Sequence, residues 1–282
     1  MSALLLFGAG ASFGSDTAGT PPLGRKLLPA LQRFDPDSWG SLPNASLAHF
    51  ATDFEMGMSR LPADIVPVLQ RTMAAYFFEF RPSASNLYLA LAQRMAARNW
   101  QGALCTLNYD RLLEISLLQA GMRPYLLQAP AAAHAVELCL PHGCSHVYCD
   151  GPADGPVAIV AEPGEHRRRL LDDALPPVMS YFEPARRAPA GAAFILSQRV
   201  RWMVLSEEAS IVVVVGVRVR SRDGHVWGPL GRTPGKVVYC GGPADVAEYK
   251  AWAEKYRPGR RDTVLQGFFR GDFERICAEA GL

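Results

Sequence analysis

Short, continuous apolar runs alternate along this chain with segments whose apolar residues recur every three or four positions. The runs lie at residues 3–7, 103–107, 136–140, 211–216 and 236–240. Apolar runs of this length, without polar alternation, are typical of parallel strands that are buried on both faces. Because helical patterns separate them, the sequence predicts an α/β fold with a Rossmann-like, doubly wound parallel sheet.

Helical periodicity is clearest between the first two predicted strands, over residues 45–100. Apolar residues there recur on one helix face, at Ile65, Val68, Leu69, Met73, Tyr76, Phe77 and Phe80. Pro82 ends this predicted helix, and Ser83 or Ser85 can cap the next one. We therefore expect a helical insertion at about residues 41–100 within a single domain of residues 1–282.

The remaining segments have plainer patterns. Helices are expected at residues 24–33, 110–120, 190–205, 246–256 and 273–279. Residues 143–188 are rich in glycine, proline and charge, which predicts loops.

Composition narrows the classes of function. The net charge of +2 over 282 residues predicts no broad nucleic-acid-binding surface. No apolar run approaches the roughly 20 residues that a membrane-spanning helix needs. The N-terminus lacks the positively charged region that opens a signal peptide. Six cysteines in a chain of this length are expected to be reduced, so we expect a cytoplasmic protein.

A glycine-rich turn follows the first predicted strand at once, with Gly8, Gly10 and Gly14 in the spacing G-x-G-x-x-x-G. Glycines in this place let backbone N–H groups approach a pyrophosphate. Tight turns also use glycine for conformational reasons alone, so that explanation stays open. Dehydrogenases continue with a helix and then a strand that ends in an acidic residue about 20 residues further on; here residues 34–44 are turn-rich instead, and there is no P-loop motif.

Polar clusters stand at the ends of the next two predicted strands. Asn108 and Asp110 follow the run at 103–107, and His142 follows the run at 136–140. Because the carboxyl ends of parallel strands share one edge of a sheet, we expect these side chains to meet the glycine turn there. Each could also be structural: Asn108 and Ser12 as turn formers, Asp110 as a helix cap and His142 as a loop histidine.

The motifs resemble those of a known superfamily in order and spacing. In chain order they are Gly8-Ala-Gly-Ala-Ser12, Thr106-x-Asn108-x-Asp110-x-x-Leu113, Ala120-Gly121, His142-Gly143, Val215-Gly216-Val217 and Gly241-Gly242. They resemble the sirtuins. The Thr-x-Asn-Tyr-Asp segment and Asp53-Phe54-Glu55 look more like the sirtuin-like domains of bacterial antiphage-defence proteins, which are similar to NAD hydrolases.

Two departures separate the chain from protein deacylases of that superfamily. Those enzymes carry a zinc ribbon built from two C-x-x-C pairs, and this sequence has no C-x-x-C. Their glycine loop continues into a Pro-Asp-Phe-Arg-Ser-like segment, where this chain has Thr20-Pro-Pro-Leu-Gly24.

The resemblance implies an NAD⁺ glycohydrolase that releases nicotinamide and ADP-ribose. It implies Asn108 and His142 as catalytic residues, with His142 as a base and Asn108 positioning the ribose or a water. The implied NAD-binding residues are Gly8, Ala9, Gly10, Ser12, Asp110, Gly216 and Val217. Arg218, Arg220, Asp223 and His225 stand where this superfamily binds the nucleotide; they could contact its adenosine ribose or phosphate, or they could be solvated loop residues.

Two further functions fit the same motifs. A non-catalytic NAD or ADP-ribose sensor would use the same binding residues, and a deacylase is the third candidate. Toxic NAD hydrolysis would need control by homo-oligomerisation, a ligand or a partner protein.

Thiol and imidazole groups crowd one segment of the chain, at Cys139, His142, Cys144, His146 and Cys149. Their spacing does not match a structural zinc site, so we expect no metal.

Overall fold

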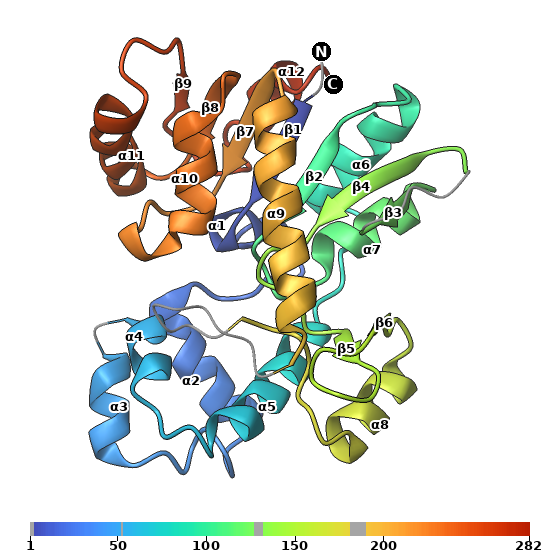
Figure 1. The fold of residues 1–282 in the computed structure, drawn as a ribbon, viewed down its shortest axis with the longest axis vertical. Coiled ribbons are helices and arrows are strands. Elements are labelled where there is room, and N and C mark those ends of the chain that lie inside the picture. Colours follow the sequence, from blue (N-terminus) through green and yellow to red (C-terminus); the bar gives the residue numbers. More distant parts are fainter. Residues whose placement is uncertain (1–2, 52, 127–131, 181–189) are drawn as a thin grey trace.

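A computed structural model describes residues 3–51, 53–126, 132–180 and 190–282. Its centre is a seven-stranded sheet with the strand order β3-β4-β2-β1-β7-β8-β9, in which every pairing is parallel (Figure 1). The strands are β1 (Ala3–Phe7), β2 (Ala103–Thr106), β3 (Arg123–Tyr125), β4 (Ala135–Cys139), β7 (Ile211–Val215), β8 (Lys236–Cys240) and β9 (Thr263–Leu265). The predicted doubly wound parallel sheet is confirmed.

Helices cover both faces of this sheet, which explains the continuous apolar runs. Within β1, Leu5 and Phe7 pack toward one helical layer, and Leu4 and Leu6 pack toward the other. The first layer holds α6 (Leu87–Ala97), α7 (Leu112–Gln119) and α12 (Phe273–Glu279). The second holds α9 (Ala192–Glu208), α10 (Gly224–Arg232) and α11 (Pro243–Tyr256). No helix in the described ranges is long and apolar enough to cross a membrane.

The remaining elements form a second lobe, which lies below the sheet in Figure 1. It contains α2 (Gly24–Phe34), α3 (Asn44–Phe50), α4 (Phe54–Ser59), α5 (Val66–Phe78), the hairpin of β5 (Val147–Cys149) and β6 (Val157–Ile159), and α8 (Pro163–Asp172). Its apolar core surrounds Trp39, which is fully buried and donates a hydrogen bond of 2.7 Å from Nε1 to Thr72 Oγ1.

The helices that lie away from the sheet differ from the expected span of 41–100. α2 belongs to the second lobe because Leu27 and Leu31 pack into the core around Trp39. α6 instead packs against the sheet through Tyr88 and Leu91. Each helix buries apolar residues on one side, and the sequence pattern alone does not say which core they meet.

The expectation of loops throughout residues 143–188 was wrong for the described part, which holds β5, β6 and α8. α8 is a polar helix, and charge pairs such as Glu165 with Arg168 (2.7 Å) lie along its surface. It is held against α5 by the ring of His166, which stacks on Phe78 at a centroid distance of 3.8 Å. Residues 181–188 of this prediction lie outside the described ranges.

The strand order has a switch point between β1 and β7. From β1 the chain continues through β2 and β4 on one side, and it later returns to place β7, β8 and β9 on the other. Open α/β sheets bind ligands outside the carboxyl ends of the strands at such a point. Strands β3 and β9 and helix α10 were not predicted, because each three-residue strand is too short to show periodicity and α10 contains Pro229.

A buried ion pair fixes the β8–β9 side of the sheet. The Arg257 side chain is fully buried and donates to the backbone carbonyls of Leu230, Thr233 and Gly235. It also contacts both carboxylate oxygens of Asp262, at 2.6 and 2.8 Å. The same carboxylate accepts a hydrogen bond from the backbone N–H of Val237 in β8.

Removing one partner of this pair should destabilise the whole domain. We expect Asp262→Ala to lower the free energy of unfolding by about 3–5 kcal/mol, because Arg257 would stay buried without its counter-ion. Urea unfolding followed by circular dichroism measures the change. Glu274→Ala is the matched control, since its pair with Arg94 lies at the surface and should contribute little. Equal losses in the two variants would contradict the prediction.

Candidate functional site

The glycine turn after β1 packs backbone against backbone with the turn after β7. The N–H of Gly8 donates to Val215 O and that of Gly10 to Gly216 O, both at 3.0 Å. A Cβ on Gly8 would lie 2.6 Å from Gly216 O, and one on Gly216 would lie 2.2 Å from the nitrogen of Ala11. Gly216 also has a φ of +64°, a conformation that favours glycine. These glycines therefore have a packing reason to be present, and their role in phosphate binding stays a prediction.

Asn108 links the loop after β2 to that glycine turn. Its Nδ2 group donates to Gly8 O at 3.0 Å and to Ser12 Oγ at 2.9 Å, and the residue is 7% exposed. Because both amide hydrogens are used, Asn108 can meet a ligand only through Oδ1, which is an acceptor. Ser12 closes the four-residue helix α1 (Ala9–Ser12) and is itself buried.

A buried polar cluster surrounds Ser12. Its hydroxyl lies 3.2 Å from the hydroxyl of Tyr88 and also hydrogen-bonds the carboxyl of Asp110. Burial raises the pKa of Asp110 to about 6, against the opposing hydrogen bonds from Leu112 N and Ser12. Burial and the nearby Asp110 charge hold the pKa of the Tyr88 hydroxyl well above its ordinary value. Asp110 also caps α7, since it accepts a hydrogen bond from Leu112 N at 3.1 Å.

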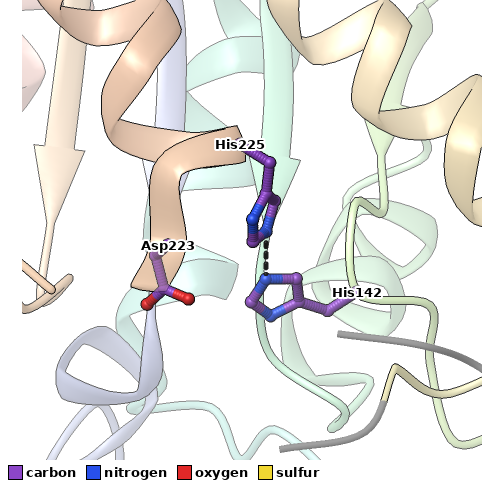
Figure 2. A group of neighbouring side chains, drawn as sticks. All are labelled: His142, Asp223 and His225. Atoms are coloured by element: carbon purple, nitrogen blue, oxygen red, sulfur yellow. Dashed lines mark hydrogen bonds between the residues drawn. The ribbon is translucent and has the colours of Figure 1, made fainter. Parts of the chain in front are cut away.

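His142 follows β4 and faces a second histidine. Its Nε2 lies 2.8 Å from Nε2 of His225, which stands in the first turn of α10 (Figure 2). Asp223, from the short 3₁₀ helix η1 (Ser221–Asp223), lies beside the two rings. His142 and Asp223 are buried, and His225 is half-buried.

The loops after β2 and β4 touch each other directly. The backbone N–H of Ser145 donates to Tyr109 O, and the Cys144 thiol donates to the same carbonyl, both at 3.2 Å. The Tyr109 hydroxyl in turn donates to Ser180 O, and Ser180 N donates to His142 O. The structure thus brings together, at one sheet edge, the segments that carry the glycine turn, Asn108, Asp110 and His142. The chemical roles of these residues remain predictions.

The cationic side chains after β7 form ion pairs. Arg218 pairs with Asp245 at 2.9 Å. Arg220 and Arg222 both pair with Asp53 and Glu55 of the α4 region, at distances between 2.6 and 3.3 Å. This four-residue charge cluster joins the second lobe to the loop after β7. Val217 is buried, and its carbonyl accepts a hydrogen bond from the Tyr239 hydroxyl.

The thiol and imidazole groups of residues 139–149 do not converge on one point. The Cys139 thiol donates to Gln198 O, and that of Cys149 donates to Ala153 O. His146 is buried against Glu114, with 2.6 Å between Nε2 and Oε2. Burial lowers the pKa of His146, but Cys144 and Glu114 outweigh it and raise that pKa to about 9.

Sequence reasoning missed two features of the site. Asp223 and His225 were expected near the nucleotide, and the structure places them beside His142. Tyr88 was not among the predicted site residues, because it reads as one apolar position of a helix. The rule that located Asn108 and His142 also applies to the segment after β7, and it could have grouped His225 with them.

Comparison with known proteins gives a fold and no close relative. No protein-family model matches the chain, and no curated protein matches it. It does resemble solved sirtuin structures over 99% of its length. One, described as "The Structural basis of Sirtuin Substrate Affinity", is 16% identical, is covered over 93% of its chain and gives a TM-score of 0.52. Another, a mutant Sir2 homologue described as an ADP ribose complex, is 17% identical, is covered over 92% and gives 0.50. The chain therefore has a sirtuin-like fold.

The backbone contact between the β1 and β7 turns gives a test of the glycines. We expect Gly216→Ala to lower the free energy of unfolding by more than about 3 kcal/mol, because the methyl group would overlap the backbone of Ala11. Gly121→Ala is the matched control: it has a φ of +78° and open space around it, so only the conformational cost of about 1–2 kcal/mol applies. Thermal unfolding compares the two, and an equal loss would argue against a tight contact.

The raised pKa of Asp110 predicts a pH-dependent cost of folding. The folded state holds this proton more tightly than the unfolded state, so stability falls as the pH rises through the range from 3.8 to about 6. Asp110→Asn should therefore stabilise the fold at pH 7.5, and this gain should vanish toward pH 3.8. Urea unfolding at both pH values measures it. A gain that does not depend on pH would contradict the buried-charge explanation.

Proposed function

We propose that this protein binds NAD⁺ at the carboxyl edge of the sheet and hydrolyses its nicotinamide–ribose bond to nicotinamide and ADP-ribose. The observation that carries the proposal is the double hydrogen bond from the Asn108 amide to Gly8 O and Ser12 Oγ. It joins two of the predicted site segments, and the loop of His142 lies against the second of them. A structure that shares this fold is described as an ADP ribose complex, and ADP-ribose is a product of the proposed reaction.

Cleavage of the nicotinamide–ribose bond needs no general acid, because nicotinamide in NAD⁺ is already cationic. Nicotinamide leaves with the electrons of the carbon–nitrogen bond and becomes neutral, while water forms the new bond to the ribose carbon. In this mechanism His142 accepts the proton of that water. Asn108 orients the water or a ribose hydroxyl through its acceptor oxygen Oδ1. The carboxylate of Asp110 offsets positive charge on the ribose.

Hydrolysis is favoured over protein deacylation by the cysteines. All six are free and buried, at scattered places in the two layers and the hairpin. The sequence holds no C-x-x-C pair from which a zinc ribbon could be built.

The biological setting follows from the resemblance to antiphage-defence domains. We propose that NAD depletion in the cytoplasm is the protein's defence output. Such an activity needs restraint, which we propose is supplied by homo-oligomerisation, a ligand or a partner protein.

A sensor that binds NAD or ADP-ribose without turnover is the second candidate. It is favoured because both proposed catalytic groups already hydrogen-bond to other groups of the protein. Nε2 of His142 faces His225 at 2.8 Å, and both amide hydrogens of Asn108 are bonded inside the protein.

Nicotinamide release from NAD⁺, followed by chromatography, tests the proposal. We expect Asn108→Ala and His142→Ala to lower the rate about 100-fold or more, since each removes a group that acts on the reacting atoms. His49→Ala, on the exposed face of α3, should keep the wild-type rate. Calorimetric binding of NAD⁺ with no nicotinamide release would favour the sensor. If the protein neither bound NAD⁺ nor released nicotinamide, both candidate functions would be refuted.

A further inference from the structure

We propose that His142, Asp223 and His225 form a binding site for a divalent transition-metal ion, with Zn²⁺ as the best fit. One ligand atom from each residue lies within 4.8 Å of the other two. Two imidazoles with one carboxylate form a donor set that zinc accepts readily, and this set leaves a fourth position open. Figure 2 shows the three side chains directed toward one another.

The spacing of the two imidazoles suits a shared ion. Their Nε2 atoms face each other at 2.8 Å. Two zinc–nitrogen bonds of about 2.0–2.1 Å at a tetrahedral angle would place these atoms about 3.3 Å apart. Moving one Nε2 atom by about half an ångström, through a small rotation of its ring, would therefore make room for the ion between the two rings. In the metal-free state one ring must donate a proton to the other, and the ion would replace that shared proton.

The backbone around the three ligands is well fixed. The carbonyl of His142 accepts a hydrogen bond of 2.8 Å from Ser180 N, and His142 follows directly on β4 and Pro141. Asp223 and His225 are two residues apart at the junction of η1 and α10, and Asp223 N donates to Arg220 O at 3.0 Å. Ligands on fixed elements lose little freedom when they bind an ion.

The charges nearby also permit a cation. Arg220 and Arg222 precede Asp223, and unpaired guanidinium groups there would repel a metal. Both are neutralised by Asp53 and Glu55, through contacts as short as 2.6 Å. Two cations face two anions in this cluster, so the cluster carries no net charge that would repel a metal ion at the adjacent ligands.

The thiol–imidazole segment is a weaker candidate. Glu114 and Cys144 lie near His146, but the three do not gather their ligand atoms on one point as the other group does. Among the residues that the structure describes, His142, Asp223 and His225 are the group that does so.

The consequence for activity rests on the proposed function. A metal ion would coordinate the lone pair on Nε2 of the neutral His142 imidazole. That nitrogen could then no longer accept a proton near neutral pH. The ion and the proposed base therefore exclude each other. Zinc occupancy would switch the enzyme off, and a chelator would restore it.

Metal binding is measured first, without reference to activity. The full chain is stripped with a chelator and titrated with Zn²⁺ against a chromogenic competing chelator. We expect one tight equivalent for the wild type, about tenfold or more weaker binding for Asp223→Asn and His225→Ala, and no change for His49→Ala. Thermal unfolding of each variant without metal separates a lost ligand from a lost fold, and Asp223→Asn keeps nearly the same shape.

Cobalt distinguishes this site from the cysteines. Co²⁺ bound by imidazole and carboxylate gives weak visible bands, whereas thiolate ligation adds an intense near-ultraviolet band. A strong thiolate band, or Zn²⁺ affinity unchanged in both folded variants, would overturn the site. These outcomes stand whether or not the protein cleaves NAD⁺.

The second arm compares NAD⁺ cleavage with and without one equivalent of Zn²⁺ in each protein. We expect zinc to lower the wild-type rate at least tenfold, reversibly with chelator. In His225→Ala the ratio of the two rates should be near one, whatever its own basal rate. Activation by zinc, or equal inhibition in wild type and variant, would overturn the inhibitory role.

Discussion

The close approach of two backbone turns holds this site together. Gly8 and Gly10 at the end of β1 lie against Gly216 at the end of β7, with no room for a side chain between them. This contact sets the spacing of the two central strands at their carboxyl ends, where the doubly wound order reverses. The Asn108 amide then attaches the loop after β2 to the same turn, through Gly8 O. One glycine-dependent contact therefore positions groups from three strands.

The polar cluster at this edge works against folding. Asp110, Asn108 and Tyr88 are all buried, and each needs a partner inside the protein. The Ser12 hydroxyl contacts all three and satisfies part of that need. A carboxyl group whose pKa is raised to about 6 by burial is a destabilised group, and such groups are common where a protein uses charge for chemistry.

The sequence was a good guide to the elements that repeat a strong pattern. The five apolar runs became β1, β2, β4, β7 and β8, and the last helix begins and ends where periodicity placed it. The three-residue strands and α8 escaped because they carry no long period, and α8 is mostly charged. The carboxyl-edge rule located Asn108 and His142 and could also have placed His225 near them, but it does not give the contacts between side chains. Whether Nε2 of His142 meets a histidine, a carboxylate or solvent depends on how α10 docks, and no local pattern encodes that.

The second lobe is assembled from two stretches of chain that are far apart. Gln70 of α5 donates to the carbonyls of Pro177 and Met179, which lie 107 and 109 residues later. The core around Trp39 likewise includes Tyr109 and Met179. During synthesis, α2 to α5 must therefore wait with part of their apolar surface uncovered until the segment around Met179 has emerged. Closing so long a loop slows folding, and the incomplete core of this lobe stays exposed in the meantime.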